Sequence, residues 1–208
     1  MFASRADAGR QLGEYLLREG VQASVVLGLP RGGVVVASEV ARVLHTPLDV
    51  LIVRKIGHPL HREFAVGALA EGEVAVLDEA LIARTPMLRA GLNDIISEEM
   101  RRLKLYQASF HPAGRPALSG RDVLLVDDGL ATGATTEAAV LSARRQNARI
   151  VVVAAPVASS NAIQRLAGVA DQVRVLVADP NFEAVGAYYQ EFTQTTDEEV
   201  LELLKAAA

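Results

Sequence analysis

The sequence predicts an α/β fold with a doubly wound, mostly parallel sheet. Five short apolar runs suit strands that are buried on both faces. Helical patterns with one apolar side alternate with several of these runs, as in strand–helix–strand units. The predicted strands are residues 24–29, 48–53, 123–126, 150–155 and 173–177, and the predicted helices are residues 6–17, 34–44, 135–146 and 161–167. Glycine-containing polar segments follow the first three strands, and ligands of such sheets bind at the carboxyl ends of strands.

An insertion at residues 58–120 interrupts this alternation. Residues 64–69 and 74–77, separated by Ala-Glu-Gly-Glu, predict a hairpin, and residues 111–120 are a proline- and glycine-containing connector. Apolar residues spaced along one helical face predict a helix that ends near residue 107: Leu92, Ile96, Met100 and Leu103. Long connections inside compact domains are usually structured or functional, so we expect the insertion to form a flap beside the site.

The length of 208 residues, 50% of them hydrophobic, predicts a single domain covering residues 1–208. Near the end of the chain, residues 178–195 concentrate aromatic side chains, which can stack on a flat ligand or, equally well, pack against the core. Thr196 and Glu199 have the spacing of a capping box and predict a C-terminal helix.

Composition excludes several classes of function. The net charge of −4 and the scattered arginines argue against a nucleic-acid partner. Without cysteine there is no disulfide, thiolate metal site or cysteine nucleophile. No apolar run is long enough to span a membrane, so we expect a cytoplasmic protein. The histidines at positions 45, 58, 61 and 111 do not form a metal-site pattern, and we expect them to be exposed.

The most informative segment is residues 123–136, where a buried strand ends in Asp127 and Asp128 and a small-residue turn leads into a helix. Backbone amides and the helix dipole favour an anion there, with hydroxyl donors at Thr132, Thr135 and Thr136. The two carboxylates suit ribose hydroxyls or a hydrated magnesium ion. The alternative is a turn that only caps the helix. Such a turn would need only one acid and one glycine, whereas this segment has two acids, several small residues and three threonines.

A second anion site is predicted after the first strand. Arg31, Gly32 and Gly33 open the next helix, so their amides and the guanidinium can meet an anion. A tight strand-to-helix turn with a solvated Arg31 is the alternative. Lys55 follows the second strand and can reach the same place by charge and length, although a surface cation explains it equally well.

Residues 123–136 resemble the phosphoribosyl pyrophosphate (PRPP) signature of type I phosphoribosyltransferases, and the chain is similar in particular to an uncharacterised bacterial branch of that family. The resemblance implies that the two acids hold the ribose hydroxyls, the next loop wraps the 5′-phosphate, and the loop after the first strand meets the pyrophosphate. The implied catalytic residues are Arg31, Lys55, Asp127 and Asp128. The resemblance also implies that residues 178–195 form a small C-terminal hood over the acceptor. The implied substrate-binding residues are Gly32, Gly33, Ala131, Thr132, Gly133, Ala134, Thr135 and, in the hood, Phe182.

The family implies transfer of a 5-phosphoribosyl group from PRPP to a nitrogen acceptor such as a nucleobase, releasing pyrophosphate, in nucleotide metabolism. Mg²⁺ is the implied cofactor, held by Asp127 and Asp128 directly or through water, and family members often form homodimers. The hood loosely resembles purine-type hoods, whereas Ala131 stands where 6-oxopurine enzymes carry an aspartate, so the acceptor stays open. A regulator that senses PRPP or a nucleotide without catalysis is the alternative. A dinucleotide-dependent dehydrogenase is disfavoured because no G-x-G-x-x-G follows the first strand.

Overall fold

The computed structural model describes residues 1–61, 65–111 and 117–207, and its centre is a five-stranded sheet. All neighbouring strands in this sheet are parallel, in the order β2-β1-β6-β7-β8. The strands are β2 (Leu48–Val50), β1 (Val25–Gly28), β6 (Asp122–Val126), β7 (Ile150–Ser159) and β8 (Gln172–Asp179). The predicted α/β fold with a mostly parallel sheet is therefore confirmed.

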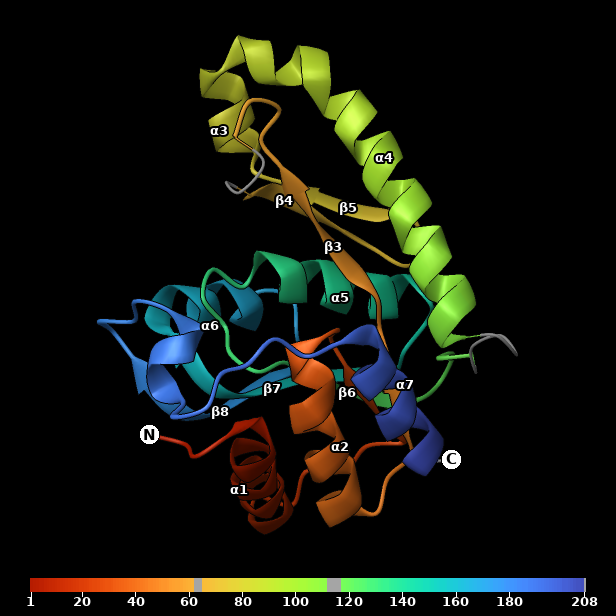
Figure 1. Ribbon diagram of the computed structural model, residues 1–208, viewed down its shortest axis with the longest axis vertical. Helices are drawn as coiled ribbons and strands as arrows, with labels where there is room; N and C mark the ends of the chain where they lie inside the picture. The colour runs from red at the N-terminus through yellow and green to blue at the C-terminus, as the bar shows by residue number, and fades with distance from the viewer. Residues whose placement is uncertain (62–64, 112–116, 208) are drawn as a thin grey trace.

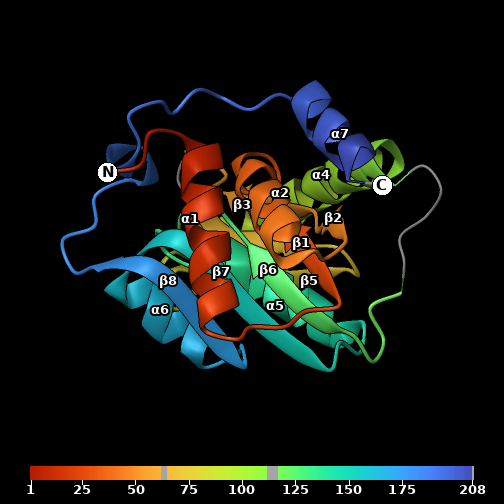
Figure 2. The same cartoon turned by 90° about the horizontal axis from the view of Figure 1, so that it is seen from below.

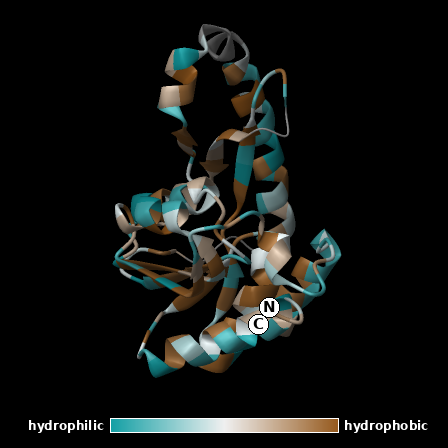
Figure 3. Ribbon diagram, turned by 90° about the vertical axis from the view of Figure 1, so that its left-hand side faces the viewer, coloured by the Kyte–Doolittle hydropathy of each residue, from teal (hydrophilic) through white to brown (hydrophobic). Residues whose placement is uncertain are grey.

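Helices cover both faces of this sheet, as Figure 2 shows from below. On one side lie α1 (Arg5–Arg18) and α2 (Gly32–Leu44), and on the other lie α5 (Ala134–Arg145) and α6 (Ser160–Ala167). Side chains of β6 alternate between the two layers: Val123 and Leu125 pack on the α5 side, whereas Leu124 packs with the residues of α1 and α2. This two-sided burial explains the continuous apolar strands, which are mostly brown in Figure 3.

The insertion begins at Val53 rather than at residue 58, because it contains a second, antiparallel sheet in the order β3-β4-β5. Its strands are β3 (Val53–Gly57), β4 (Ala65–Ala70) and β5 (Val74–Leu77), so the predicted hairpin is confirmed for its described residues. The predicted single strand at 48–53 is wrong. The N–H of Leu51 still donates to Gly28 O of β1 (3.1 Å), but that of Ile52 donates to Glu71 Oε1 (3.0 Å) instead, so the parallel pairing ends there and the chain continues into β3.

Two helices complete the insertion, α3 (Glu79–Arg84) and α4 (Pro86–Phe110). The predicted helix is confirmed within α4, although it ends at Phe110 rather than near residue 107. Figure 1 shows α3 and the start of α4 far from the five-stranded sheet, while β3 reaches down to it. The prediction that all four histidines are exposed is wrong for two of them. His58 is half-buried, and the side chain of His111 is 8% exposed and lies 3.4 Å from both Asp49 and Glu71.

The C-terminal helix α7 (Asp197–Ala206) begins with the predicted capping box. Thr196 Oγ1 accepts the N–H of Glu199 at 3.1 Å, and Glu199 Oε2 accepts the N–H of Thr196 at 2.7 Å. Val200 is fully buried in a cluster that includes Val34 of α2. Among the described residues, no helix has the length and hydrophobicity to cross a membrane. The cytoplasmic location, the flap role of residues 58–120 and the exclusion of nucleic acid stay predictions.

Candidate functional site

The loops after β1 and β6 touch each other at the carboxyl edge of the five-stranded sheet. A methyl group added at Gly32 would lie 2.1 Å from Asp128 Oδ2, and one added at Gly33 would lie 2.9 Å from the Cα of Asp127. Both glycines lie in the first turn of α2, and the Pro30–Arg31 peptide bond is cis. The absence of side chains thus lets the predicted pyrophosphate loop lie directly against the two acids.

The predicted phosphate loop leads from β6 into α5 and is held by the neighbouring strand β7. The N–H of Leu130 donates to Val157 O at 2.9 Å, and the hydroxyl of Ser159 donates to Ala131 O at 2.6 Å. Gly133 precedes α5 with a φ of 74°, a conformation that suits glycine. The N-terminus of α5 therefore opens onto the loop formed by Ala131, Thr132, Gly133, Ala134 and Thr135.

The three threonine side chains near this loop differ in their exposure to solvent. The side chain of Thr132 accepts the N–H of Ala134 at 3.4 Å and is exposed, and Thr135 is half-buried. Thr136, however, is only 2% exposed. The prediction that Thr136 can offer its hydroxyl to a phosphate is wrong, because the period of the helix turns this residue toward the core.

A cavity of about 710 Å³ lies between this edge of the sheet and the insertion. Three residues named from the sequence, Arg31, Lys55 and Thr135, line it together. Two more lining residues, Arg54 and Tyr106, were not singled out from the sequence. Tyr106 comes from α4, which no local motif connects to the site, and Arg54 Nε also pairs with Glu99 Oε2 at 2.8 Å.

The cations of this cavity differ in their partners. Arg31 Nη1 lies 3.6 Å from Asp197 Oδ1 at the start of α7. Lys55 is exposed and has neither a hydrogen bond nor an ion pair within the part of the chain that the structure describes. Its ammonium group is therefore available to an anion that enters the cavity.

The two neighbouring acids have different electrostatic environments. Burial, followed by the negative charge of Asp128, raises the pKa of Asp127 to about 8. The N–H of Asp128, which donates to Asp127 Oδ1 at 2.9 Å, and the charge of Lys55 oppose this rise. Asp128 Oδ2 instead accepts from Arg5 Nε at 2.7 Å. One acid is thus held protonated near neutral pH, while the other is paired with a cation.

The donor set of these acids fits Mg²⁺ as a partner of substrate phosphates. Carboxylate oxygens are hard ligands, and Mg²⁺ in phosphate sites usually takes one or two carboxylates and keeps several waters. The described residues contain no group of three or more histidine, aspartate or glutamate side chains arranged to hold a metal. Asp127 and Asp128 would therefore bind the ion together with substrate oxygens and water.

The hood is bound to the loop that carries the acids. The hydroxyl of Tyr189 donates to Asp128 O at 2.5 Å, and Val185 Cγ1 lies 2.6 Å from a methyl position at Gly129. Phe182 stacks on Tyr188, with ring centroids 5.3 Å apart, and does not line the cavity. The sequence offered no sign of Arg5, which lies 123 residues before its partner Asp128.

Comparisons with known proteins identify the family of this chain. The sequence profile described as "Phosphoribosyl transferase domain" matches residues 5–191. Two Mycobacterium tuberculosis proteins, from strains CDC 1551 and H37Rv and named provisionally as phosphoribosyl transferases, are each 44% identical over all 208 residues. The chain covers 47% of each, so it spans about half the length of these curated relatives.

Solved structures extend the similarity. A crystal structure of a Thermus thermophilus protein is 44% identical, with a TM-score of 0.80 over 100% of this chain and 99% of that one. An Aquifex aeolicus protein, 12% identical with a TM-score of 0.52 over 97% of this chain and 85% of that one, shares the fold alone. Since the profile match includes both glycine loops, the acids and most of the hood, the chain belongs to the phosphoribosyl transferase domain family.

Proposed function

We propose that this domain transfers a 5-phosphoribosyl group from PRPP to a ring nitrogen of a nucleobase and releases pyrophosphate, with Mg²⁺ as cofactor. The single observation that carries the proposal is the pair of helix N-termini, of α2 and α5, on either side of Asp127 and Asp128. Each N-terminus favours an anion, and the acids between them suit a sugar. PRPP has this order of groups: a phosphate, a ribose and a pyrophosphate.

Each part of PRPP has proposed partners. The 5′-phosphate binds the amides and hydroxyls of residues 131–135, and Asp127 and Asp128 accept hydrogen bonds from the ribose hydroxyls. The pyrophosphate binds the amides of Gly32 and Gly33 and the cations of Arg31 and Lys55, in the cavity that these cations line. Mg²⁺ bound beside the acids would supply further positive charge to the phosphate oxygens.

The arrangement suits the charge changes of glycosyl transfer. Breaking the C1–O bond builds positive charge on the ribose ring and negative charge on the leaving pyrophosphate. Arg31 and Lys55 would therefore stabilise the transition state more than the bound substrate. Exclusion of water by the insertion would limit hydrolysis of PRPP, the competing reaction.

The acceptor base is the least defined part of the proposal. Phe182 is the proposed aromatic contact in the hood, and a base would meet it by extending or displacing the stack on Tyr188. Participation in nucleotide metabolism and a homodimeric state belong to the same proposal and rest on the family resemblance.

Two measurements on the same protein test this function. Calorimetric titration of PRPP with Mg²⁺ into folded protein is expected to show binding, and Asp128→Asn is expected to weaken it strongly. A panel of purines, pyrimidines and orotate is then screened for pyrophosphate release. The absence of PRPP binding would contradict the proposal, and binding without release for every base would favour a PRPP-sensing regulator instead.

A further inference from the structure

Arg5, the first residue of α1, makes three contacts at the edge of the candidate site. Its Nε donates to Asp128 Oδ2 at 2.7 Å, and its Nη1 donates to Thr193 O at 2.6 Å. The same guanidinium lies over the ring of Phe192, 3.8 Å from its centroid. One side chain thus joins the N-terminal helix, a proposed ribose ligand and the end of the hood.

The position of Arg5 is not explained by the stability of its own helix. Cations are unfavourable at a helix N-terminus, where the dipole is positive, and favourable in the last turn. Ser4 already caps α1 by accepting the N–H of Asp7 at 3.3 Å. The charge of Arg5 therefore has its compensation outside α1, at Asp128.

The ion pair between Arg5 and Asp128 is shielded from solvent. The side chains of the two residues are 12% and 16% exposed, so the attraction is less screened than in a surface pair. A methyl group at Gly32 would lie 2.7 Å from Arg5 Nε, which places the guanidinium beside the proposed pyrophosphate loop as well. Asp128 is consequently fixed between a cation on one side and a backbone loop on the other.

We propose that Arg5 is the positioning residue for Asp128: it holds this carboxylate in the orientation that receives the ribose hydroxyls. The inference rests on the proposed function. It adds a residue from the start of α1 to a site otherwise built from loops after strands. Arg5 acts through Asp128 and does not itself contact the reacting atoms.

Arg5 also offsets the repulsion between the two acids. Asp128 is faced by the carboxyl group of Asp127 in its own loop, by Arg5 from α1, and by the hydroxyl of Tyr189, which donates to its backbone oxygen. Lys55 from β3 acts on Asp127 rather than through a direct bond to Asp128. Removing Arg5 would leave Asp128 without the donor that fixes its carboxylate beside Asp127.

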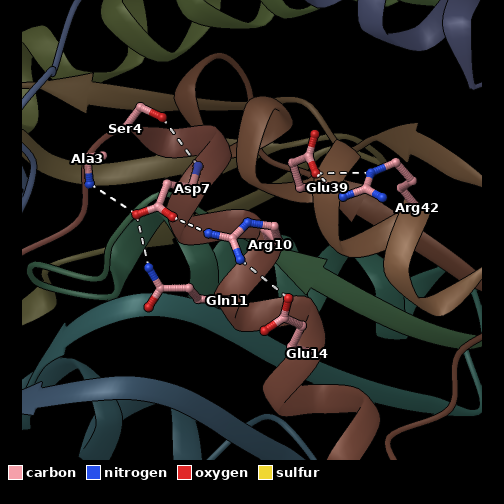
Figure 4. Close-up of polar contacts among 8 residues, drawn as sticks. All are labelled: Ala3, Ser4, Asp7, Arg10, Gln11, Glu14, Glu39 and Arg42. Atoms are coloured by element: carbon pink, nitrogen blue, oxygen red, sulfur yellow. Dashed lines mark hydrogen bonds and ion pairs between the residues drawn. The ribbon is translucent and has the colours of Figure 1, made fainter.

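The test compares Arg5→Met, Arg5→Lys and a control on the same helix. Arg10 suits the control because it is also paired with acids of α1, at 2.6 Å from Asp7 and 3.5 Å from Glu14, but is 49% exposed. Figure 4 shows this exposed network, in which Arg10 lies between its two partners. PRPP affinity with Mg²⁺ is measured by calorimetry at one pH, after circular dichroism has confirmed that each variant is folded.

We expect Arg5→Met to weaken PRPP binding about 10- to 100-fold. Arg5→Lys keeps the charge and should restore part of the affinity, but not all of it, because an ammonium group cannot reproduce the planar two-nitrogen contact. Arg10→Met should bind PRPP as the wild type does.

Wild-type affinity in folded Arg5→Met would overturn the inference while leaving the proposed function intact. An equal loss in Arg10→Met would also overturn it, because the effect would then come from α1 as a whole. If the wild-type protein itself does not bind PRPP, the proposed function fails, and the positioning role fails with it.

Discussion

The carboxyl edge of the five-stranded sheet and the insertion contribute to the cavity in different ways. At the sheet edge the functional groups are held by neighbours: Arg5 pairs with Asp128, and Ser159 binds the carbonyl of Ala131. The insertion contributes Lys55, an exposed cation on a long flexible side chain. The difference indicates that the sheet edge fixes the place of the ribose and phosphate, while the insertion adds charge that adapts to the ligand.

Gly32→Ala tests the fixed geometry of the sheet edge and should have the largest effect. The added methyl would lie 2.1 Å from Asp128 Oδ2, so the carboxylate or the loop must move. Since a displacement of about 1 Å can cost about 100-fold in activity, we expect at least that loss in kcat/KM for PRPP. Gly168→Ala is the control, because its methyl would meet only Arg165 O at 3.5 Å. Unchanged kinetics in Gly32→Ala would mean that the edge is adaptable.

Replacing one cation from each region compares their contributions directly. Arg31→Ala removes a donor at the sheet edge and should lower kcat/KM for PRPP about 100-fold. Lys55→Met, in the insertion, should lower it about tenfold, because an exposed side chain holds its ligand less firmly. Lys104→Met, an exposed position on α4, serves as the control. A larger loss in Lys55→Met than in Arg31→Ala would reverse the comparison.

The pH dependence of binding sharpens the electrostatic part of the comparison. With the pKa of Asp127 raised to about 8, its ionised form grows about fivefold between pH 7 and pH 8. If the ribose hydroxyls need the carboxylate, PRPP affinity should rise by about that factor, as titrations at the two pH values would show. A flat profile would mean that Asp127 binds as the neutral acid.

The same raised pKa makes a prediction for the ligand-free protein. Between the ordinary value of 3.8 and about 8, the folded state keeps a proton on Asp127 that the unfolded chain has released. Stability should therefore fall as the pH rises through this window, and Tm of the wild type should decrease from pH 5 to pH 8. Asp127→Asn should have a flatter Tm profile, and an equally steep one would assign the dependence to other groups.

Removing a hydrogen bond that connects the two regions should have the smallest effect on activity. The buried hydroxyl of Ser142, on α5, donates to Glu71 O in the insertion at 2.6 Å. Ser142→Ala leaves that carbonyl without this partner, so the free energy of unfolding should fall by about 1 to 3 kcal/mol in urea denaturation. PRPP binding should stay unchanged, whereas Ser38→Ala, which removes a bond within α2, should cost less. Lost binding in Ser142→Ala would show that this bond also shapes the site.

The sequence predicted those parts of the fold that are determined by residues close together in the chain. The buried strand of β6, the acids that follow it and the glycine turn before α5 are neighbours in the chain, so their pattern alone located them. The capping box of Thr196 and Glu199 is likewise a spacing of three residues. The end of β2 at Val50 could not be predicted, because it depends on Glu71, whose side chain binds the N–H of Ile52 from 19 residues away.

Distance along the chain also concealed parts of the site. Arg5 and Tyr106 reach it only because α1 and α4 pack beside it, and neither lies in a local motif. The prediction for Phe182 depends on the ability of aromatic rings to stack on flat bases. An aromatic ring also stacks on another aromatic ring, and in the structure Phe182 stacks on Tyr188. Thr136 was one residue too far into α5, where the helical period turns it inward.

The side chain of Ser159 holds the phosphate loop in its conformation without a bound ligand. Its hydroxyl donates to the carbonyl of Ala131 and accepts the N–H of Ala162 at 3.0 Å, which ties the loop to the start of α6. A loop that is already arranged loses little conformational entropy when it closes around a phosphate. Most of the free energy of that contact is then left for affinity, and encounter need not wait for a slow rearrangement.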